Sequence, residues 1–138
     1  MNELLDAIHA IVPAIDFLPI YKEETPPDEA QPPWLILTTS VGAEDARLSG
    51  RVLSHTATLE ARIATLTATQ ANIAALTLLD AVTGATPHAD GYTFGAAVLS
   101  ADSGTYLAGT DTTPVHAYQT GGLWNVRVLR WRILWSRR

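Results

Sequence analysis

The chain has 138 residues, 47% of them hydrophobic and 17% charged, a composition typical of one folded domain and not of a disordered chain. Its formal net charge of −5 argues against a general nucleic-acid binder, and the lack of cysteine excludes disulfide bonds and thiolate metal sites. No stretch approaches the roughly 18 consecutive apolar residues of a membrane span, and the first residues do not resemble a signal peptide, so we expect a soluble protein.

The first part of the chain predicts a helix followed by two strands. Apolar residues recur at helical spacing from about residue 3 to residue 15, and Pro13 should kink or end this helix. FLPIYK (17–22) is typical of a short edge strand, and WLILTTSV (34–41) is typical of a buried strand. The charged, proline-rich segment 24–33 should be an exposed connection between them, so we expect a hairpin with a long tip.

The middle of the chain carries the clearest periodicity. In residues 51–66 apolar and polar side chains alternate, which predicts a long strand with one buried face. Thr67 followed by Gln70 is a helix-capping pattern, and Gly84 stands where a helix would end. The apolar stretch between them should therefore be a helix packed on the sheet. YTFGAAVL (92–99) predicts a further strand.

The last third of the chain predicts a loop and a final strand. Residues 100–122 are rich in Gly, Ser, Thr and Asp without periodicity, so we expect a long loop that serves a contact. WNVRVLRWRILWSRR (124–138) could form an amphipathic helix, but its β-branched and aromatic residues favour a strand. The alternation slips between Val128 and Leu129, which indicates a β-bulge or burial on both faces.

Together these segments predict a single α+β domain spanning residues 1–138. The expected order is a helix, three strands, a helix and two strands, with a mixed or antiparallel sheet of about five strands flanked by the two helices. Segments 24–33 and 100–122 are the expected exposed loops. No internal repeat or linker divides the chain.

Few residues are candidates for catalysis or metal binding. The chain has no phosphate-binding glycine motif and no serine nucleophile elbow. His55 falls on the apolar face of its strand, as a core or subunit-facing histidine would. His88 and Asp90 could imitate a metal or acid–base pair, but a turn explains them more simply. The histidines as a set are not spaced as metal ligands: His9, His55, His88 and His116. We therefore expect no enzymatic activity, metal or cofactor.

Basic residues are concentrated at the end of the chain and acidic residues near its start. The final segment, with its interleaved arginines and tryptophans, has three possible roles. It could be a stacking platform for single-stranded nucleic acid, a membrane-bound amphipathic helix, or a core strand whose arginines face solvent or a neighbouring subunit. We favour the core strand, with the acidic part of one subunit meeting the basic part of the next. The arginines concerned are Arg127, Arg130, Arg132, Arg137 and Arg138.

Along nearly its whole length, the chain resembles the tail terminator proteins of long-tailed, siphovirus-type bacteriophages. The resemblance rests on the opening amphipathic helix and on the order of the segments that follow it. These segments are PPWLILTTSV (32–41), VLSHTATLEARIATLT (52–67), an apolar helix closing on TGA (83–85), GYTFGAAVLSADS (91–103), a long polar loop and WNVRVLRWRILWSRR (124–138).

This resemblance implies a structural virion protein without catalytic activity. Such a protein is made in the host cytoplasm and forms a ring, expected to be a hexamer, that caps the tail tube, ends tube polymerisation and joins the tail to the neck. Its implied partners are other copies of itself, the tube protein and a neck or head-completion protein, with no membrane. Two alternatives stay open: another head-completion or neck connector of the same phages, and a small nucleic-acid-binding module.

On this interpretation the terminal arginines would contact a neighbouring subunit or, without reading sequence, the DNA in the lumen of the ring. The two long polar segments would contact the tube on one side and the neck on the other. Their candidate contact residues are Glu23, Glu24, Asp28, Glu29, Asp102, Tyr106 and Asp111.

Overall fold

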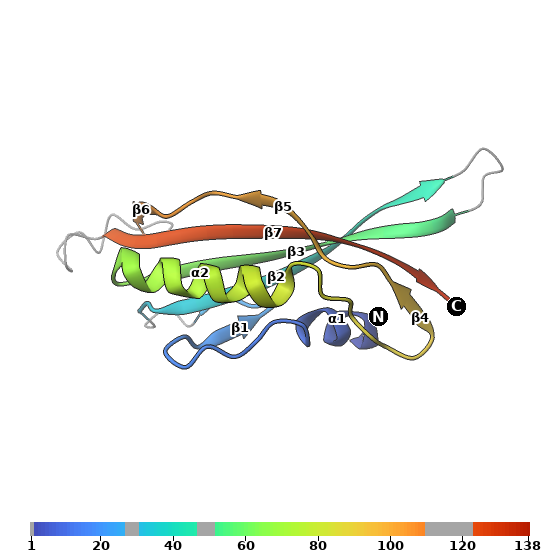
Figure 1. Ribbon diagram of the computed structural model, residues 1–138, viewed down its shortest axis with the longest axis horizontal. Helices are drawn as coiled ribbons and strands as arrows, with labels where there is room; N and C mark the ends of the chain where they lie inside the picture. The colour runs from blue at the N-terminus through green and yellow to red at the C-terminus, as the bar shows by residue number, and fades with distance from the viewer. Residues whose placement is uncertain (1, 27–30, 47–51, 110–122) are drawn as a thin grey trace.

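The computed structural model describes residues 2–26, 31–46, 52–109 and 123–138. These residues form two helices and seven strands (Figure 1). In chain order the elements are α1 (Asn2–His9), β1 (Ile20–Lys22), β2 (Trp34–Ala46), β3 (Val52–Thr65), α2 (Ala68–Val82), β4 (Tyr92–Phe94), β5 (Val98–Asp102), β6 (Tyr106–Gly109) and β7 (Leu123–Arg137).

The strands form one mixed sheet in which β7 is nearly central. The order across the sheet is β1-β2-β3-β7, and β4, β5 and β6 follow one another along the remaining side of β7. β1 is parallel to β2, and all other pairs are antiparallel. β3 and β7 pair without a register shift from His55–Trp135 to Thr65–Asn125, so these two strands form the regular centre of the sheet.

The second helix begins and ends where its local sequence predicts. The Thr67 hydroxyl accepts a hydrogen bond from the Gln70 N–H at 3.1 Å, which satisfies one of the free donors of the first turn. At the other end Gly84 has a φ of +86°, a backbone conformation that favours glycine. The face of α2 turned to the sheet is lined by small and aliphatic residues: Ala71, Ala74, Ala75, Leu78 and Val82.

The main core lies between the helices and one face of the sheet. Both helices contribute to it, as do the alternate residues of β3 that the sequence predicted to be buried. On β7 the same face carries Leu129, Trp131, Ile133 and Trp135. Trp131 is fully buried, and its indole N–H donates to the Thr83 hydroxyl at 2.9 Å just after α2, so the final strand is tied to the end of this helix.

A second, smaller core lies on the opposite face of the sheet. It contains Ala64 of β3 with Trp124 and Val126 of β7, and Trp34 packs against it. The slip in the alternation of the last segment therefore has a simple cause. β7 is buried on one face at its start and on the other face from Leu129 onward, while its pairing with β3 stays regular. The structure favours burial on both faces over a bulge in β7.

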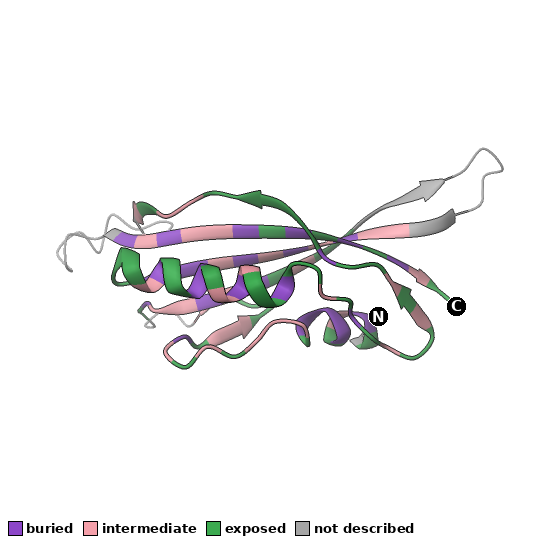
Figure 2. Ribbon diagram, in the orientation of Figure 1, coloured by how far each residue is buried: buried purple, intermediate pink, exposed green. Residues whose placement is uncertain are grey.

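The sheet has more strands than the five or so predicted, and their order differs. The predicted strand 92–99 is divided into β4 and the start of β5, and part of the predicted loop 100–122 belongs to β5 and β6. At the division, Ala97 turns into the core and exchanges backbone hydrogen bonds with Gly84 and Ala85. β5 and β6 have no periodicity because their backbones pair with β7 while their side chains stay largely exposed (Figure 2).

The predicted hairpin between β1 and β2 is also wrong, because these strands are parallel. A parallel connection needs a crossover of about a dozen residues, and segment 23–33 is long enough to provide one. The turn away from β1 is made at Glu23, whose φ is +58° and whose N–H donates to the Leu37 carbonyl at 2.7 Å. The same polar, proline-rich composition suits a crossover and a hairpin tip, so the sequence alone did not distinguish them.

Among the helices that the structure describes, none has the length and apolar character needed to cross a bilayer.

Candidate functional site

The arginines predicted as contact residues lie on β7 and just after it, but on different faces of the sheet. Arg127 pairs with Ile63 and lies on the face that the helices cover, as does Arg137. Arg130 and Arg132 lie on the opposite face. The basic segment is therefore divided between two faces, and each arginine has its own surroundings.

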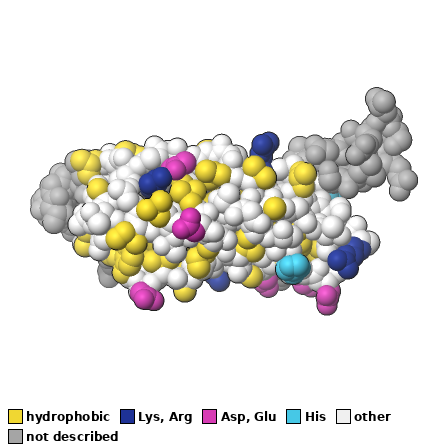
Figure 3. All heavy atoms as spheres, viewed as in Figure 1, with side chains coloured by type: hydrophobic (Ala, Val, Ile, Leu, Met, Phe, Trp, Pro, Cys, Tyr) yellow, Lys and Arg dark blue, Asp and Glu magenta, His cyan; other side chains and the backbone are white. Residues whose placement is uncertain are grey.

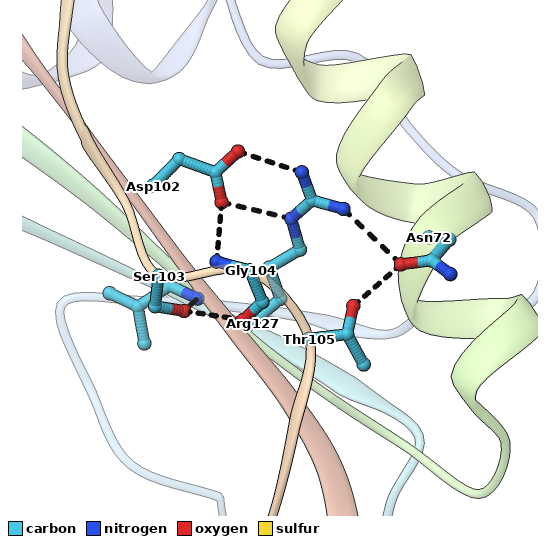
Figure 4. A network of polar contacts seen from close by, with 7 residues as sticks. Asn72, Asp102, Ser103, Gly104, Thr105 and Arg127 are labelled. Atoms are coloured by element: carbon cyan, nitrogen blue, oxygen red, sulfur yellow. Dashed lines mark hydrogen bonds and ion pairs between the residues drawn. The ribbon is translucent and has the colours of Figure 1, made fainter.

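Arg127 is held in a network within its own chain (Figure 4). Its Nε donates to Oδ1 of Asp102 at 2.9 Å, and its Nη2 donates to Oδ2 of the same carboxylate at 2.7 Å. Its Nη1 donates to Oδ1 of Asn72 on α2 at 3.2 Å, and that oxygen also accepts from the Thr105 hydroxyl at 2.6 Å. The Gly104 N–H donates to Asp102 at 2.9 Å. The network joins β7, α2 and the turn between β5 and β6.

The electrostatics of this partly buried pair are governed by the hydrogen bond between its members. The Arg127 and Asp102 side chains are only 16% and 25% exposed. The hydrogen bond from Arg127 lowers the pKa of Asp102 below its ordinary value, although burial opposes this shift. The same hydrogen bond raises the pKa of Arg127. Both groups stay charged and engaged with each other, and Arg127 is thereby occupied within its own chain.

Arg130 is also paired within the chain, whereas Arg132 has no ion pair with any residue that the structure describes. Nε of Arg130 donates to Oε1 of Glu60 at 2.8 Å, across the β3–β7 pair in which the two residues are directly opposed. Arg132 is exposed beside Val98 of β5, and the described residues give it no ion pair. Of these two arginines, Arg132 is the one whose charge is open to an outside partner.

The last two arginines lie beside β4. The guanidinium of Arg137 stands 5.9 Å from the centre of the Tyr92 ring, within the range of a cation–π contact. Nε of Arg138 donates to the Thr93 hydroxyl at 3.3 Å. Both arginines are exposed, so their charges remain at the surface at this end of the sheet.

The β5–β6 segment, most of which falls in the predicted contact loop 100–122, is an exposed edge of the sheet. Asp102 ends β5 and is bound to Arg127, and Tyr106 begins β6. All five residues of β5 are exposed, and Leu107 of β6 is 62% exposed. The large hydrophobic side chains exposed on this edge are Val98, Leu99, Tyr106 and Leu107. Figure 3 shows hydrophobic side chains along this edge and over α2.

At the opposite edge of the sheet, just after β1, Glu23 has a structural role. Its Oε2 lies 2.9 Å from Nε2 of His9, at the end of α1, and its Oε1 accepts from the Thr39 N–H at 3.0 Å. Burial raises the pKa of Glu23, but the hydrogen bonds from Thr39 and His9 outweigh it, so the pKa lies below its ordinary value. Glu24 is exposed. The other predicted contact residues, Asp28, Glu29 and Asp111, lie outside the described residues.

The remaining histidines have surroundings that differ from one another. His55 stacks on Trp135, with ring centres 4.3 Å apart and an interplanar angle of 22°. His88 and Asp90 are exposed before β4, in the predicted connection between helix and strand. His116 lies outside the described part of the chain. No cluster of His, Asp or Glu suited to a metal ion occurs among the described residues.

Reasoning from the sequence missed the partners of these groups. The alternation of residues 51–66 predicts only a polar position for Glu60, and the apolar stretch after Thr67 predicts only a helix for Asn72. The spacing of the histidines argued only against a metal site that includes His9. No local signal identifies them, because each partner lies at least 14 residues away along the chain. The register of β3 against β7 and the position of α2 over the sheet bring them together.

The chain matches no protein-family model and no curated protein.

Proposed function

We propose that this protein is a structural subunit of a bacteriophage virion, a tail terminator that assembles into a ring on the end of the tail tube. The resemblance along the sequence suggests this role. The observation that supports it best is the exposed β5–β6 edge, which carries four large hydrophobic side chains and whose one charged residue, Asp102, is neutralised by Arg127. Such an edge is suited to protein contacts, because exposed edge strands are normally protected by charge or proline.

The hydrophobic surface that this edge can bury limits the strength of a single contact between subunits. Its hydrophobic side chains are between 36% and 62% exposed, so burying them gives about 1 kcal/mol each, or about 4 kcal/mol together. Bringing two proteins together costs about 4 to 15 kcal/mol in lost translational and rotational freedom. One edge contact is therefore weak by itself. A ring on a tube end, where each subunit has several contacts, suits these magnitudes better than a stable free dimer.

The proposed ring would have a tube on one side and a neck on the other, at the tail–neck junction of the virion. In this role Arg132 is the best candidate among the arginines of β7 for contact with a neighbouring subunit or with DNA, since it is exposed and lacks an ion pair in the described chain. Glu24 is a candidate for contact through the 24–33 segment. The protein would act by binding alone, without catalysis or a cofactor.

The test is electron microscopy of the purified protein mixed with purified tail tubes of the same phage. We expect a ring-shaped cap on one end of the tubes and no further growth of capped tubes when tube protein is added. Labelled subunits on the head side of the neck would favour a head-completion or neck connector instead. Salt-sensitive binding to short oligonucleotides by a protein that ignores tubes would favour a nucleic-acid-binding module.

A further inference from the structure

The two edges of the sheet differ in length and in chemistry. One edge is formed by β4, β5 and β6 along β7, and the other by β1 along β2. β1 pairs only with Leu35–Leu37, and Glu23 then caps the Thr39 N–H with its carboxylate. Beyond that point, within the described residues, β2 has β3 on one side and no strand on the other. Val41, in this open part of β2, is an exposed hydrophobic residue.

The β5–β6 edge has little of the usual protection against pairing with another strand. Edge strands present unpaired backbone N–H and C=O groups, and natural proteins block them with lysine, proline or bulges. β5 and β6 contain no lysine, arginine or proline. One register shift, between Leu99 and Ala101, interrupts β5. Among the described strands, only β7 pairs with β5 and β6, so their outer sides can accept an incoming strand, with hydrophobic side chains next to them.

The exposed charges near the two edges have opposite signs. Among the described residues beside the β1–β2 edge, the exposed acidic residues Asp16 and Glu24 outnumber the exposed basic residue Lys22. Beside the β4–β6 edge, the exposed basic residues Arg132, Arg137 and Arg138 outnumber the exposed acidic residue Asp90, which lies just before β4. Two β4–β6 edges facing each other would bring arginines together. A β4–β6 edge facing a β1–β2 edge brings opposite charges together.

We propose that copies of this chain associate head to tail, with the β5–β6 edge of one copy pairing with the open β1–β2 edge of the next. The sheet then continues from subunit to subunit, and the contact is heterologous, as rings and open helical arrays require. This inference deepens the proposed function by naming the subunit interface. It depends on that function only in requiring that copies assemble, and it makes no claim about the tube.

Disulfide trapping tests this interface directly, because the chain has no cysteine of its own. One set of variants carries a single cysteine on the β5–β6 edge, Leu99→Cys or Leu107→Cys. A second set carries one on the open part of β2, Val41→Cys. Leu107 and Val41 pair with residues of the helix-covered face, so a continuous sheet places them on the same side. Two positions are tested on the β5–β6 edge because a disulfide needs Cα atoms about 4.4 to 6.8 Å apart, so each position reports on a different register between copies.

Mixtures of one variant from each set are oxidised mildly and separated by non-reducing electrophoresis. We expect mixed dimers between the sets in preference to dimers within a set. We also expect a ladder of oligomers from a chain that carries both cysteines of a productive pair. Ile73→Cys, on the outer side of α2, is the matched control: it is also exposed and hydrophobic, and it should not enter mixed dimers.

Dimers formed mainly between two β5–β6 cysteines would overturn the head-to-tail arrangement, because they indicate a twofold contact. Cross-linking no stronger than that of the Ile73→Cys control, in variants with unchanged circular dichroism, would overturn the interface itself. The proposed function is separated by its own readout. If the protein forms mixed dimers but never caps tubes, the interface is supported and the tail terminator role is rejected. If the protein caps tubes but forms no mixed dimers, the tail terminator role is supported and the interface is rejected.

Discussion

The guanidinium of Arg127 and the carboxylate of Asp102 form a two-pronged ion pair between β7 and the end of β5, with N–O distances of 2.9 and 2.7 Å. Asn72 of α2 binds the remaining guanidinium nitrogen. The pair therefore connects the sheet edge, the central strand and the helix above them. It also removes Arg127 from the set of basic groups available to a partner, which changes how the terminal arginines should be tested.

The first prediction concerns the stability that this pair provides. Asp102→Asn should lower the free energy of unfolding by about 1–2 kcal/mol, because it weakens a partly buried, charge-assisted interaction. The measurement is urea denaturation at neutral pH, followed by circular dichroism. Asp80→Asn is the control, since Asp80 lies exposed on α2 and its substitution should change little. Equal effects of the two substitutions would contradict a stabilising role for the pair.

The same pair predicts a dependence on pH. The pKa of Asp102 in the folded protein lies below its ordinary value of 3.8, so protonation favours the unfolded chain. The advantage of the native protein over Asp102→Asn should be constant above about pH 5 and should shrink as the pH falls below about 4, through the folded-state pKa. Denaturation series at several pH values measure it. An advantage that grows on acidification would contradict the assignment.

A third prediction concerns Glu23, which joins α1 and β2. Glu23→Gln should reduce stability by about 1 kcal/mol, because the charged acceptor for the Thr39 N–H and the partner of His9 are replaced by a neutral amide. Glu24→Gln removes the same charge at the next residue, which is exposed, and it should have an effect within about 0.5 kcal/mol. The measurement is the midpoint of thermal unfolding of both variants under the same conditions. Equal midpoints for the two variants would show that the contacts of Glu23 with Thr39 and His9 do not stabilise the fold.

The buried indole of Trp131 gives a fourth prediction. Thr83→Val removes the acceptor of its N–H and should cost about 1–3 kcal/mol, because a buried donor is left unsatisfied. Thr83→Ser keeps the hydroxyl and should retain most of the stability. Denaturation followed by tryptophan fluorescence measures both variants. A valine variant as stable as the native protein would contradict a stabilising role for this hydrogen bond.

The arginines of β7 give a fifth prediction, on assembly. Arg132→Glu should leave the free energy of unfolding within about 0.5 kcal/mol of the native value, since its side chain is exposed, but it should weaken capping of tail tubes. Arg127→Glu should instead destabilise the subunit by about 2 kcal/mol or more, because it sets two carboxylates against each other. Electron microscopy of tube ends and urea denaturation separate the two effects. Normal capping by Arg132→Glu would argue against a contact through this arginine.

Several parts of the fold could be read from the sequence because their causes are local. The alternation of residues 52–65 specifies a strand with one buried face, and Thr67 with Gln70 marks the first turn of α2. The aromatic and β-branched residues of the last segment favour a strand over a helix, and β7 confirms this. Each of these signals depends only on neighbours within a few residues.

Other parts were decided by pairing between distant segments. β5 and β6 are strands because the free side of β7 offers backbone hydrogen bonds to them, and such bonds leave no pattern in the side chains. The parallel pairing of β1 with β2 depends on the path of a connection whose composition also suits a hairpin tip. The pairing of Arg130 with Glu60 and of Arg127 with Asp102 depends on the register of β7 against its neighbours.

By itself, then, the sequence determined where α2, β3 and β7 form and which face of β3 is apolar, because these depend on local backbone preferences and on the periodicity of side chains. Only the tertiary structure decided which charges are neutralised within the chain and which remain exposed. A long-range ion pair exists only once the sheet has set two distant strands side by side, and no spacing along the chain encodes that distance.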